Sequence, residues 1–564
     1  MERRVLLAIS LSFLVLFAYQ TYFAPKPSSP APDVPVGAPA TLPGQAPPAA
    51  PGGPALAVQP APTATPQPPP VAVVVGDRAE RDITVETGTV RAVFTNRGAR
   101  LKSWVLKNYR NDAGEPLNLV PAPDNVNDAL QPFSLRFDDA GLTSRVNGAL
   151  FGSPAPATVD ATGSPATISF EWQDAEGMRV TKAFTLQPDG FVVEVAVSAT
   201  RGTEVLNPGI DWGPGLGDDI ANAPPGKFLR PSYSTPAQAL LHQNNSVTRF
   251  TASAAGNAEG SFLYAGMDDH YFTALILNNG PQASPFRFDH TSFVVPPKSE
   301  GAPPGRYAAF GVHFDAPPPS MRFYVGPKAF DQLRAIDTEM VRVINFGIFS
   351  WLAVPLLGAL KWVHGYVGNW GWSIVAITLL INLVMFPLRQ RSVSSMRKMQ
   401  EIQPQMKAIQ ARYANFKITD PQRQKMNEEV MALYKEKGVN PASGCVPMLL
   451  TFPFLFAFYA MLSQAIEIRG ADFVGWITDL SRPDPLFITP VLMGATMFWQ
   501  QRLTPTSADP VQQRVMMVMP IMFTFMFLSY PSGLVIYWTI SNLWAIGQQY
   551  LTNTMAPLPA KAKS

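Results

Sequence analysis

The chain has 564 residues, which is too long for one ordinary domain. Hydrophobic residues make up 47% of it and charged residues only 15%, and the net charge of +3 by itself suggests neither an acidic nor a nucleic-acid partner. The single cysteine, Cys445, excludes an internal disulfide framework and a cysteine-rich metal site, and we interpret it as a small packing residue.

Residues 1–23 combine a basic start with the apolar run "VLLAISLSFLVLFAYQTYF". A cleaved signal peptide is the alternative, but no small-residue cleavage site follows Ala18, so we predict an uncleaved transmembrane anchor. Residues 24–77 are mostly Pro, Ala, Gly and Val, a composition that cannot bury a core. We therefore predict an exported linker between the anchor and the next domain.

Residues 78–326 are predicted to form a β-sandwich. "SFEWQDAEGMRVTKAFTLQPDGFVVEVAVSA" alternates apolar and polar residues between Ala-Glu-Gly and Pro-Asp-Gly turns. Further strands are expected at about 271–277, 286–295, 307–314 and 320–325. Many short strands and few helical periods favour a sandwich, and about 250 residues suffice for a large core.

Residues 327–369 change to helical spacing. The stretch "IFSWLAVPLLGALKWVHGYVGNWG" is apolar and edged with tryptophans, but Pro355, Lys361 and His364 interrupt it. We predict an amphipathic helix that lies in the outer membrane interface, and a full membrane span is the alternative.

Residues 370–551 contain the strongest apolar segments, each close to the twenty residues that a bilayer requires. With the anchor they make six predicted transmembrane helices. The five core spans are expected at about 370–388, 446–466, 486–503, 513–530 and 533–551, followed by a tail at 552–564.

Positive charge predicts the orientation of these spans. The segment 389–437 has eleven Lys and Arg against five Asp and Glu, so we place it in the cytoplasm. The loop 468–485 has two arginines against three aspartates and is placed outside. Lys561 and Lys563 place the C-terminus inside, so both termini are predicted to be cytoplasmic and the β-domain to be periplasmic.

The segment 390–438 is predicted to be a cytoplasmic helical hairpin. The Asp420-Pro421 pair is typical of a helix start, and Gly438 of a helix end. The simplest interpretation is a solvated loop that joins two spans. The functional alternative is a docking arm for a ribosome, a nascent chain or a targeting factor, because methionine surfaces adapt to varied partners. The candidate docking residues are Arg397, Lys398, Met399, Met406, Met426 and Met431.

The core resembles the YidC/Oxa/Alb membrane protein insertase family, in its Gram-negative YidC form with a large periplasmic domain. The likeness covers nearly all of residues 365–550. It is carried by "VGNWGWSIVAIT", "MALYKEKGVNPASGCVPML", "PVLMGATMFWQQRLTPT", "DPVQQRVMMVMPIMFTFMF" and "YPSGLVIYWTISNL". The resemblance implies an inner-membrane insertase and assembly chaperone with a hydrophilic groove open to the cytoplasm and to lipid. It further implies as partners nascent membrane proteins, Sec translocon components, a ribosome or the signal recognition particle receptor, and membrane lipids.

Asn382 lies in the middle of the first core span, where an unpaired amide costs a few kcal/mol. The family typically carries an arginine facing the groove at this position, so the resemblance implies a groove that keeps hydrogen-bonding capacity but loses a fixed positive charge. The alternative is that such polar groups only join helix to helix. The candidate groove residues are Asn382, Thr378, Gln501, Trp538, Ser541 and Asn542.

Two other functions compete with this interpretation. A solute transporter or channel usually has intramembrane charges, broken helices and internal repeats, but the predicted spans lack Asp, Glu, Lys and Arg near their centres, and no inverted repeat is visible. A sugar-processing enzyme would use the β-domain, in which "MDDHYF" places Asp268, Asp269 and His270 together. No nucleophile motif, metal spacing or phosphate loop accompanies this cluster, so we expect no enzyme activity, no cofactor, no metal and no nucleic-acid substrate.

Overall fold

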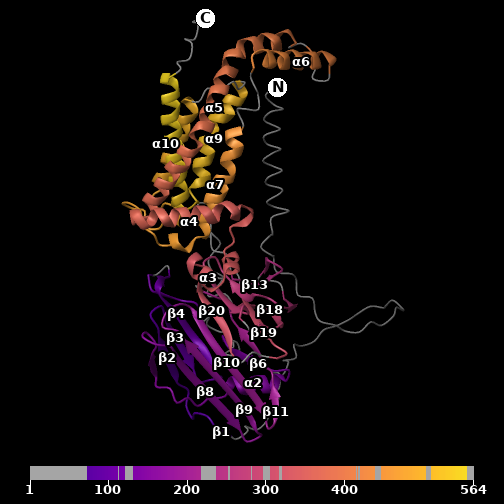
Figure 1. The fold of residues 1–564 in the computed structure, drawn as a ribbon, viewed down its shortest axis with the longest axis vertical. Coiled ribbons are helices and arrows are strands. Elements are labelled where there is room, and N and C mark those ends of the chain that lie inside the picture. Colours follow the sequence, from indigo (N-terminus) through magenta and orange to yellow (C-terminus); the bar gives the residue numbers. More distant parts are fainter. Residues whose placement is uncertain are drawn as a thin grey trace, which may run out of the picture.

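The structure is a computed structural model, and it divides into a β-domain and a helical bundle (Figure 1). The residues that it describes are 73–111, 114–120, 131–217, 237–251, 255–280, 283–295, 305–316, 320–413, 416, 420–438, 446–503 and 510–555. The predicted anchor at 1–23, most of the linker, the C-terminal end of the tail and Cys445 lie outside these ranges.

The largest sheet of the β-domain has ten strands, all paired antiparallel. Its order is β1-β8-β9-β10-β20-β17-β16-β13-β14, and β11 also pairs with β10. The strands are β1 Val73–Val75, β8 Ala166–Asp174, β9 Met178–Leu186, β10 Val192–Arg201, β11 Glu204–Leu206, β13 Gln238–Gln243, β14 Ser246–Phe250, β16 Tyr264–Asp268, β17 Phe272–Leu277 and β20 Met321–Pro327. β1 belongs to this sheet although the sequence places residues 73–75 in the linker.

Two further sheets of five strands each complete the β-domain. One has the order β15-β18-β19-β12-β6 and the other β5-β4-β3-β2-β7, in which β2 and β7 run parallel. The elements are β2 Asp82–Glu86, β3 Val90–Thr95, β4 Arg100–Arg110, β5 Pro116–Asn118, β6 Ser134–Arg136, β7 Thr158–Asp160, β12 Gly209–Trp212, β15 Gly256–Gly260, β18 Phe286–Val295 and β19 Gly305–His313. Helix α2, Ala140–Gly148, packs beside β6. The four strands expected at the end of this domain coincide with β17 to β20 within two residues.

Aromatic side chains join the three sheets around one core. β9 alternates strictly between buried and half-buried or exposed residues, which turns Phe184 inward. The Phe184 ring lies 4.6 Å from that of Phe94 on β3 and 5.3 Å from that of Phe133, and the Phe133 ring lies 5.3 Å from that of Trp212 on β12. Sheets far apart in the sequence therefore share one set of apolar contacts.

A buried lysine closes one end of this core. Lys182 on β9 donates from Nζ to the carbonyl oxygens of Gly98, Ala99 and Phe133 at 2.7, 3.2 and 2.7 Å. Ala99 and Phe133 both have positive φ angles, of 46° and 68°, which non-glycine residues rarely adopt. The three N–H groups of one ammonium thus satisfy three carbonyls from two separate turns with positive φ angles.

The helical bundle follows the β-domain. Its elements are α3 Phe330–Ile336, the 3-10 turns η2 Thr338–Val343 and η3 Gly347–Phe349, α4 Ser350–Val367, α5 Trp370–Arg412, α6 Pro421–Glu436, α7 Val446–Gln464, the turn η5 Ile466–Ile468, α8 Ile488–Leu503, α9 Pro510–Phe527 and α10 Ser532–Met555. α5 continues without a break from the first core span into the arm predicted as a separate hairpin helix, and it contains Pro387 and Pro404. α10 continues into the first residues of the predicted tail.

Two segments in the described part of the chain are long and apolar enough to cross a membrane, Gly347–Val367 and Trp370–Met399. Phe452–Gln464 and Met516–Phe527 are shorter apolar helices. In Figure 1, α4 lies across the end of the bundle that faces the β-domain, whereas α5 and α10 run along its length. The same figure places α6 at the opposite end of the bundle.

Contacts between α3, η5 and the β-domain seat the bundle on that domain. Glu467 accepts from the backbone N–H of Phe330 at 3.2 Å and lies 3.7 Å from Lys361. Arg469 lies over the rings of Tyr271 and Phe272, 5.5 and 5.3 Å from their centroids. The joint is therefore built from charged and aromatic side chains as well as from apolar packing.

Candidate functional site

Asn382 occupies a buried position between α5 and α10. Its side chain is 2% exposed, and Nδ2 donates to the carbonyl of Thr378 at 2.8 Å and to Oγ of Ser541 at 3.3 Å. The hydroxyl of Thr378 donates back to the carbonyl of Ile374 at 2.6 Å. The structure thus brings three predicted groove residues together, and the amide that looked costly in the sequence is fully paired.

Arg389 adds a cation to this group, and sequence reasoning missed it. Its Nη1 donates to Oδ1 of Asn382 at 2.8 Å. Arg389 lies seven residues after Asn382, two turns further along the same face of α5. A spacing of seven on a helix could have indicated the pair, but the sequence alone does not tell which way a flexible arginine extends.

The remaining predicted residues of α10 face other helices. Asn542 donates to Oγ1 of Thr496 on α8 at 3.2 Å. The ring of Trp538 packs against Phe527 on α9, with centroids 4.9 Å apart. Ser541 therefore faces α5, whereas its neighbour Asn542 faces α8. Gln501, near the end of α8, is half-buried, and no contact joins it to the other predicted groove residues among those described.

Polar contacts continue from Ser541 toward the far end of the α5–α10 interface. Thr552 donates to Oε1 of Gln390 at 2.9 Å, and Nε2 of Gln548 lies 3.4 Å from the carbonyl of Phe386. Arg397 donates to Asn553. We call this set the polar seam, and it consists of Thr378, Asn382, Arg389, Gln390, Arg397, Ser541, Gln548, Thr552 and Asn553. The signal in the sequence is the spacing of Ser541, Gln548 and Thr552, which repeats with the helical period.

The structure divides the candidate docking residues of the hairpin. Lys398 and Met431 are exposed, and Met399 is half-buried. Met406 accepts a hydrogen bond from the Tyr434 hydroxyl at 3.0 Å, so its sulfur packs inside the hairpin. Met426 is half-buried beside Arg423. Arg397 is only 7% exposed and belongs to the polar seam, so the expectation that it lies on a docking surface does not match its position.

The side chains of the Asp268–His270 cluster in the β-domain form ion pairs and hydrogen bonds with other parts of the protein. Asp268 is paired with Arg249 and Lys328 at 3.3 and 3.2 Å, and Asp269 accepts from two backbone N–H groups of the following turn. His270 lies 2.6 Å from the carbonyl of Ser463 on α7. Burial raises the pKa of Asp269 to about 6 and lowers that of His270. All three side chains thus have structural partners, as expected for strand-end residues.

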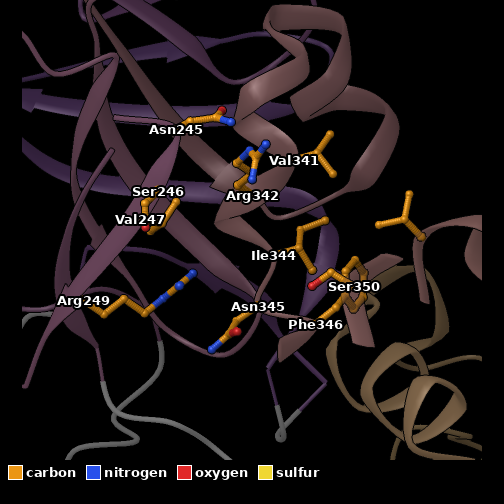
Figure 2. Close-up of a pocket in the computed structure, with 11 residues that line it drawn as sticks. Asn245, Ser246, Val247, Arg249, Val341, Arg342, Ile344, Asn345, Phe346 and Ser350 are labelled. Carbon is orange, nitrogen blue, oxygen red and sulfur yellow. The ribbon is translucent and has the colours of Figure 1, made fainter. Parts of the chain in front are cut away.

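A cavity of about 270 Å³ lies where the β13–β14 edge meets η2 and α4 (Figure 2). Arg249 and Arg342 line it, but Arg249 is paired with Asp268, and Arg342 with Glu339 at 2.6 Å. Its two cations are therefore already neutralised within the protein. Within the described residues, no group of three or more His, Cys, Asp or Glu side chains could hold a metal ion.

A β-rich domain seated on a bundle of apolar helices, with a polar seam between two of them, is the architecture of a membrane protein with polar side chains between its helices. Family models agree with this architecture. The one described as "60Kd inner membrane protein" matches residues 362–559, and "YidC periplasmic domain" matches residues 82–359.

Proteins called "Membrane protein insertase YidC" match over the full length. The one from Syntrophus aciditrophicus is 32% identical and covers 99% of this chain and 100% of its own, and the one from Geobacter sulfurreducens is 36% identical over 98% of each. A crystal structure titled "Active YidC insertase crystal structure with the first transmembrane domain resolved" aligns with 85% of this chain and 94% of its own, at 18% identity and a TM-score of 0.35. The chain belongs to the YidC membrane protein insertase family.

Proposed function

We propose that the polar seam between α5 and α10 receives the hydrophilic end of a newly made membrane protein during its insertion into the inner membrane. The observation that carries this proposal is the hydrogen-bonded group of Asn382, Ser541 and Arg389, which lies inside a bundle with an apolar outer surface. An unpaired polar group in lipid costs several kcal/mol, so a polar surface within the bundle lowers the barrier for a polar segment.

The outer faces of the same helices suit the apolar part of a substrate. Leu383 on α5, Val491 on α8 and Phe525 on α9 are 58%, 57% and 64% exposed. Exposed apolar side chains of this kind are expected to face lipid. A substrate helix would slide along them while its polar end passes the seam, and burial of its apolar area in lipid drives the step.

The proposed topology has six spans, namely the anchor at 1–23 and α5, α7, α8, α9 and α10, with both termini in the cytoplasm. The segment Gly347–Val367 is apolar enough to span, but α4 lies across the bundle, and Trp351, Trp362 and Tyr366 are exposed on it. Such aromatic residues favour the membrane interface, so we place α4 there. The hairpin of α5 and α6 then extends into the cytoplasm.

The proposed partners are nascent membrane proteins, Sec translocon components, a ribosome or targeting receptor at the hairpin, and membrane lipids. We propose no enzymatic role for the β-domain, because the Asp268–His270 cluster is committed to internal contacts. A solute transporter is less well supported, since the described spans have no carboxylate paired with Arg389 to serve as a coupling site.

Photo-crosslinking tests the proposed function. A photoreactive residue at position 541 should capture a nascent single-span protein, because Ser541 faces the polar seam. The matched control is position 543 on the same helix, where Leu543 is 44% exposed and should yield lipid adducts. Lipid adducts alone at both positions, together with equal insertion in vesicles with and without the purified protein, would contradict the proposal.

A further inference from the structure

The side chain of Arg389 extends in an unusual direction. Its Cα lies two helical turns, about 10 Å, beyond that of Asn382 toward the hairpin. The guanidinium nevertheless reaches Oδ1 of Asn382 at 2.8 Å, so it points back into the span. Basic side chains near the end of a span ordinarily extend toward the membrane surface. Arg389 therefore brings its charge toward the bilayer centre instead of away from it.

The amide of Asn382 is oriented to hold this cation. Its two N–H groups are directed to the carbonyl of Thr378 and to Oγ of Ser541, which leaves the oxygen facing Arg389. The reversed orientation would set the amide donors against guanidinium donors and the amide oxygen against the carbonyl of Thr378, so the hydrogen bonds to Arg389 and Thr378 would be lost. Asn382 is thus a positioning residue for the charge of Arg389.

The cation has no anion of its own among the described residues. Arg389 forms no ion pair with the described residues, its only hydrogen bond to them is the one to the Asn382 oxygen, and the one titratable group near enough to influence it is the phenol of Tyr537. A guanidinium has five N–H donors in a planar fork that matches a carboxylate. A half-buried arginine with free donors is therefore suited to bind an anion that arrives from outside the chain.

We propose that Arg389, held in place by Asn382, binds a carboxylate of the polar segment that enters the seam, and so favours substrates with acidic tails. This inference rests on the proposed function of the seam. It changes what the sequence implied, because the positive charge that is missing at position 382 is supplied by a residue two turns away.

The test uses the full-length protein in vesicles and two single-span substrates that differ only in their translocated tail, with Asp in one and Asn in the other. Arg389→Gln should slow insertion of the acidic substrate about tenfold, the loss expected for one charge-assisted hydrogen bond. It should change insertion of the neutral substrate by less than about twofold. The matched control is Arg391→Gln, because Arg391 is exposed on the same helix and should affect neither substrate.

Moving the guanidinium from position 389 to position 382 distinguishes a loss of substrate binding from a loss of folding. The double variant Asn382→Arg/Arg389→Gln returns a guanidinium to the same place from the other position, and it should restore insertion of the acidic substrate. Equal losses on both substrates, or no rescue by the swap, would overturn the inference and leave the proposed function intact. An Arg389 effect that depended on anionic phospholipid and not on the tail would assign the site to a lipid phosphate, and it too would overturn the inference. If the wild type inserted neither substrate, both the proposed function and this inference would fail.

Discussion

Asp211 shows how the β-domain keeps a carboxylate in a buried position. On β12 it lies 3.3 Å from Nε of Arg136, which also pairs with Asp289 at 2.6 Å. A Cβ at position 311 would come within 2.3 Å of the Asp211 carboxylate, so Gly311 leaves the space that the pair occupies. Burial raises the pKa of Asp211 to about 6, because Arg136 only partly offsets the lost hydration.

This pKa predicts a pH dependence of domain stability. The folded domain takes up a proton at Asp211 below about pH 6, whereas the unfolded chain does so only near pH 4. The stabilising contribution of this group is therefore fully present below about pH 4 and is lost as the pH rises through 6. Relative to the wild type, Asp211→Asn should gain up to about 3 kcal/mol in free energy of unfolding between pH 4 and pH 7.

Hydrogen exchange of β12 and β19 in the full-length protein would measure this difference. Wild type and variant are compared at the same pH, so that intrinsic exchange rates cancel. A difference in protection that stays constant between pH 4 and pH 7 would show that Asp211 titrates normally.

At the scale of single elements, α8 packs closely against α9 at Gly494. A Cβ added there would lie 1.9 Å from Oγ1 of Thr524 and 3.2 Å from its Cβ. Thr524 in turn donates to the carbonyl of Pro520 at 2.8 Å within α9. Small residues allow this close packing between membrane helices, where no hydrophobic effect drives association.

We expect Gly494→Ala to destabilise the bundle by about 1–3 kcal/mol, the usual cost of overpacking. The midpoint of thermal unfolding in detergent would fall. Adding Thr524→Ala removes the clashing oxygen and should restore most of the loss. Gly358→Ala on α4 is the matched control, because nothing lies within 4 Å of the added Cβ. A lower midpoint in the control, or no rescue in the double variant, would contradict this packing.

At the scale of the whole molecule, a small joint sets how the β-domain sits on the bundle. Arg469 covers the rings of Tyr271 and Phe272 and donates to the carbonyl of Arg110 at 3.1 Å. His270 adds a contact with the carbonyl of Ser463 on α7. These contacts come from a short outer loop and the end of α7, and they add to hydrogen bonds from Arg249 and Tyr264 of the β-domain to the carbonyls of Val343 and Glu339.

Arg469→Ala should loosen this alignment, since each cation–π contact contributes about 0.5–1 kcal/mol. Spin labels on the β-domain and on the outer end of α10 would report it as a broader distribution of distances. Arg287→Ala is the control, because Arg287 pairs with Asp289 inside the β-domain. An unchanged distribution for Arg469→Ala would mean that Arg469 does not set this alignment.

Much of the architecture could be predicted from the sequence because its signals are local. Alternation with a period of two marks β9, long apolar runs mark the core helices, and Asp420-Pro421 marks the start of α6, where Asp420 caps the helix. Two segments differ from the sequence prediction because contacts with other parts of the chain decide their structure. β1 pairs with β8 although its local composition resembles a linker, and α5 accommodates Pro387 and Pro404 without ending.

The candidate site was only partly predictable. The sequence by itself determined that Asn382 and Ser541 are polar residues in apolar spans, because hydropathy depends on composition alone. Only the tertiary structure decided that Ser541 meets Asn382 while Asn542 turns to α8, that Arg397 is buried, and that Arg389 reaches back into the span. The physical reason is that the direction of a side chain depends on the partners that neighbouring helices provide, and for Asn542, Asn382 and Arg397 those partners lie 46, 159 and 156 residues away in the chain.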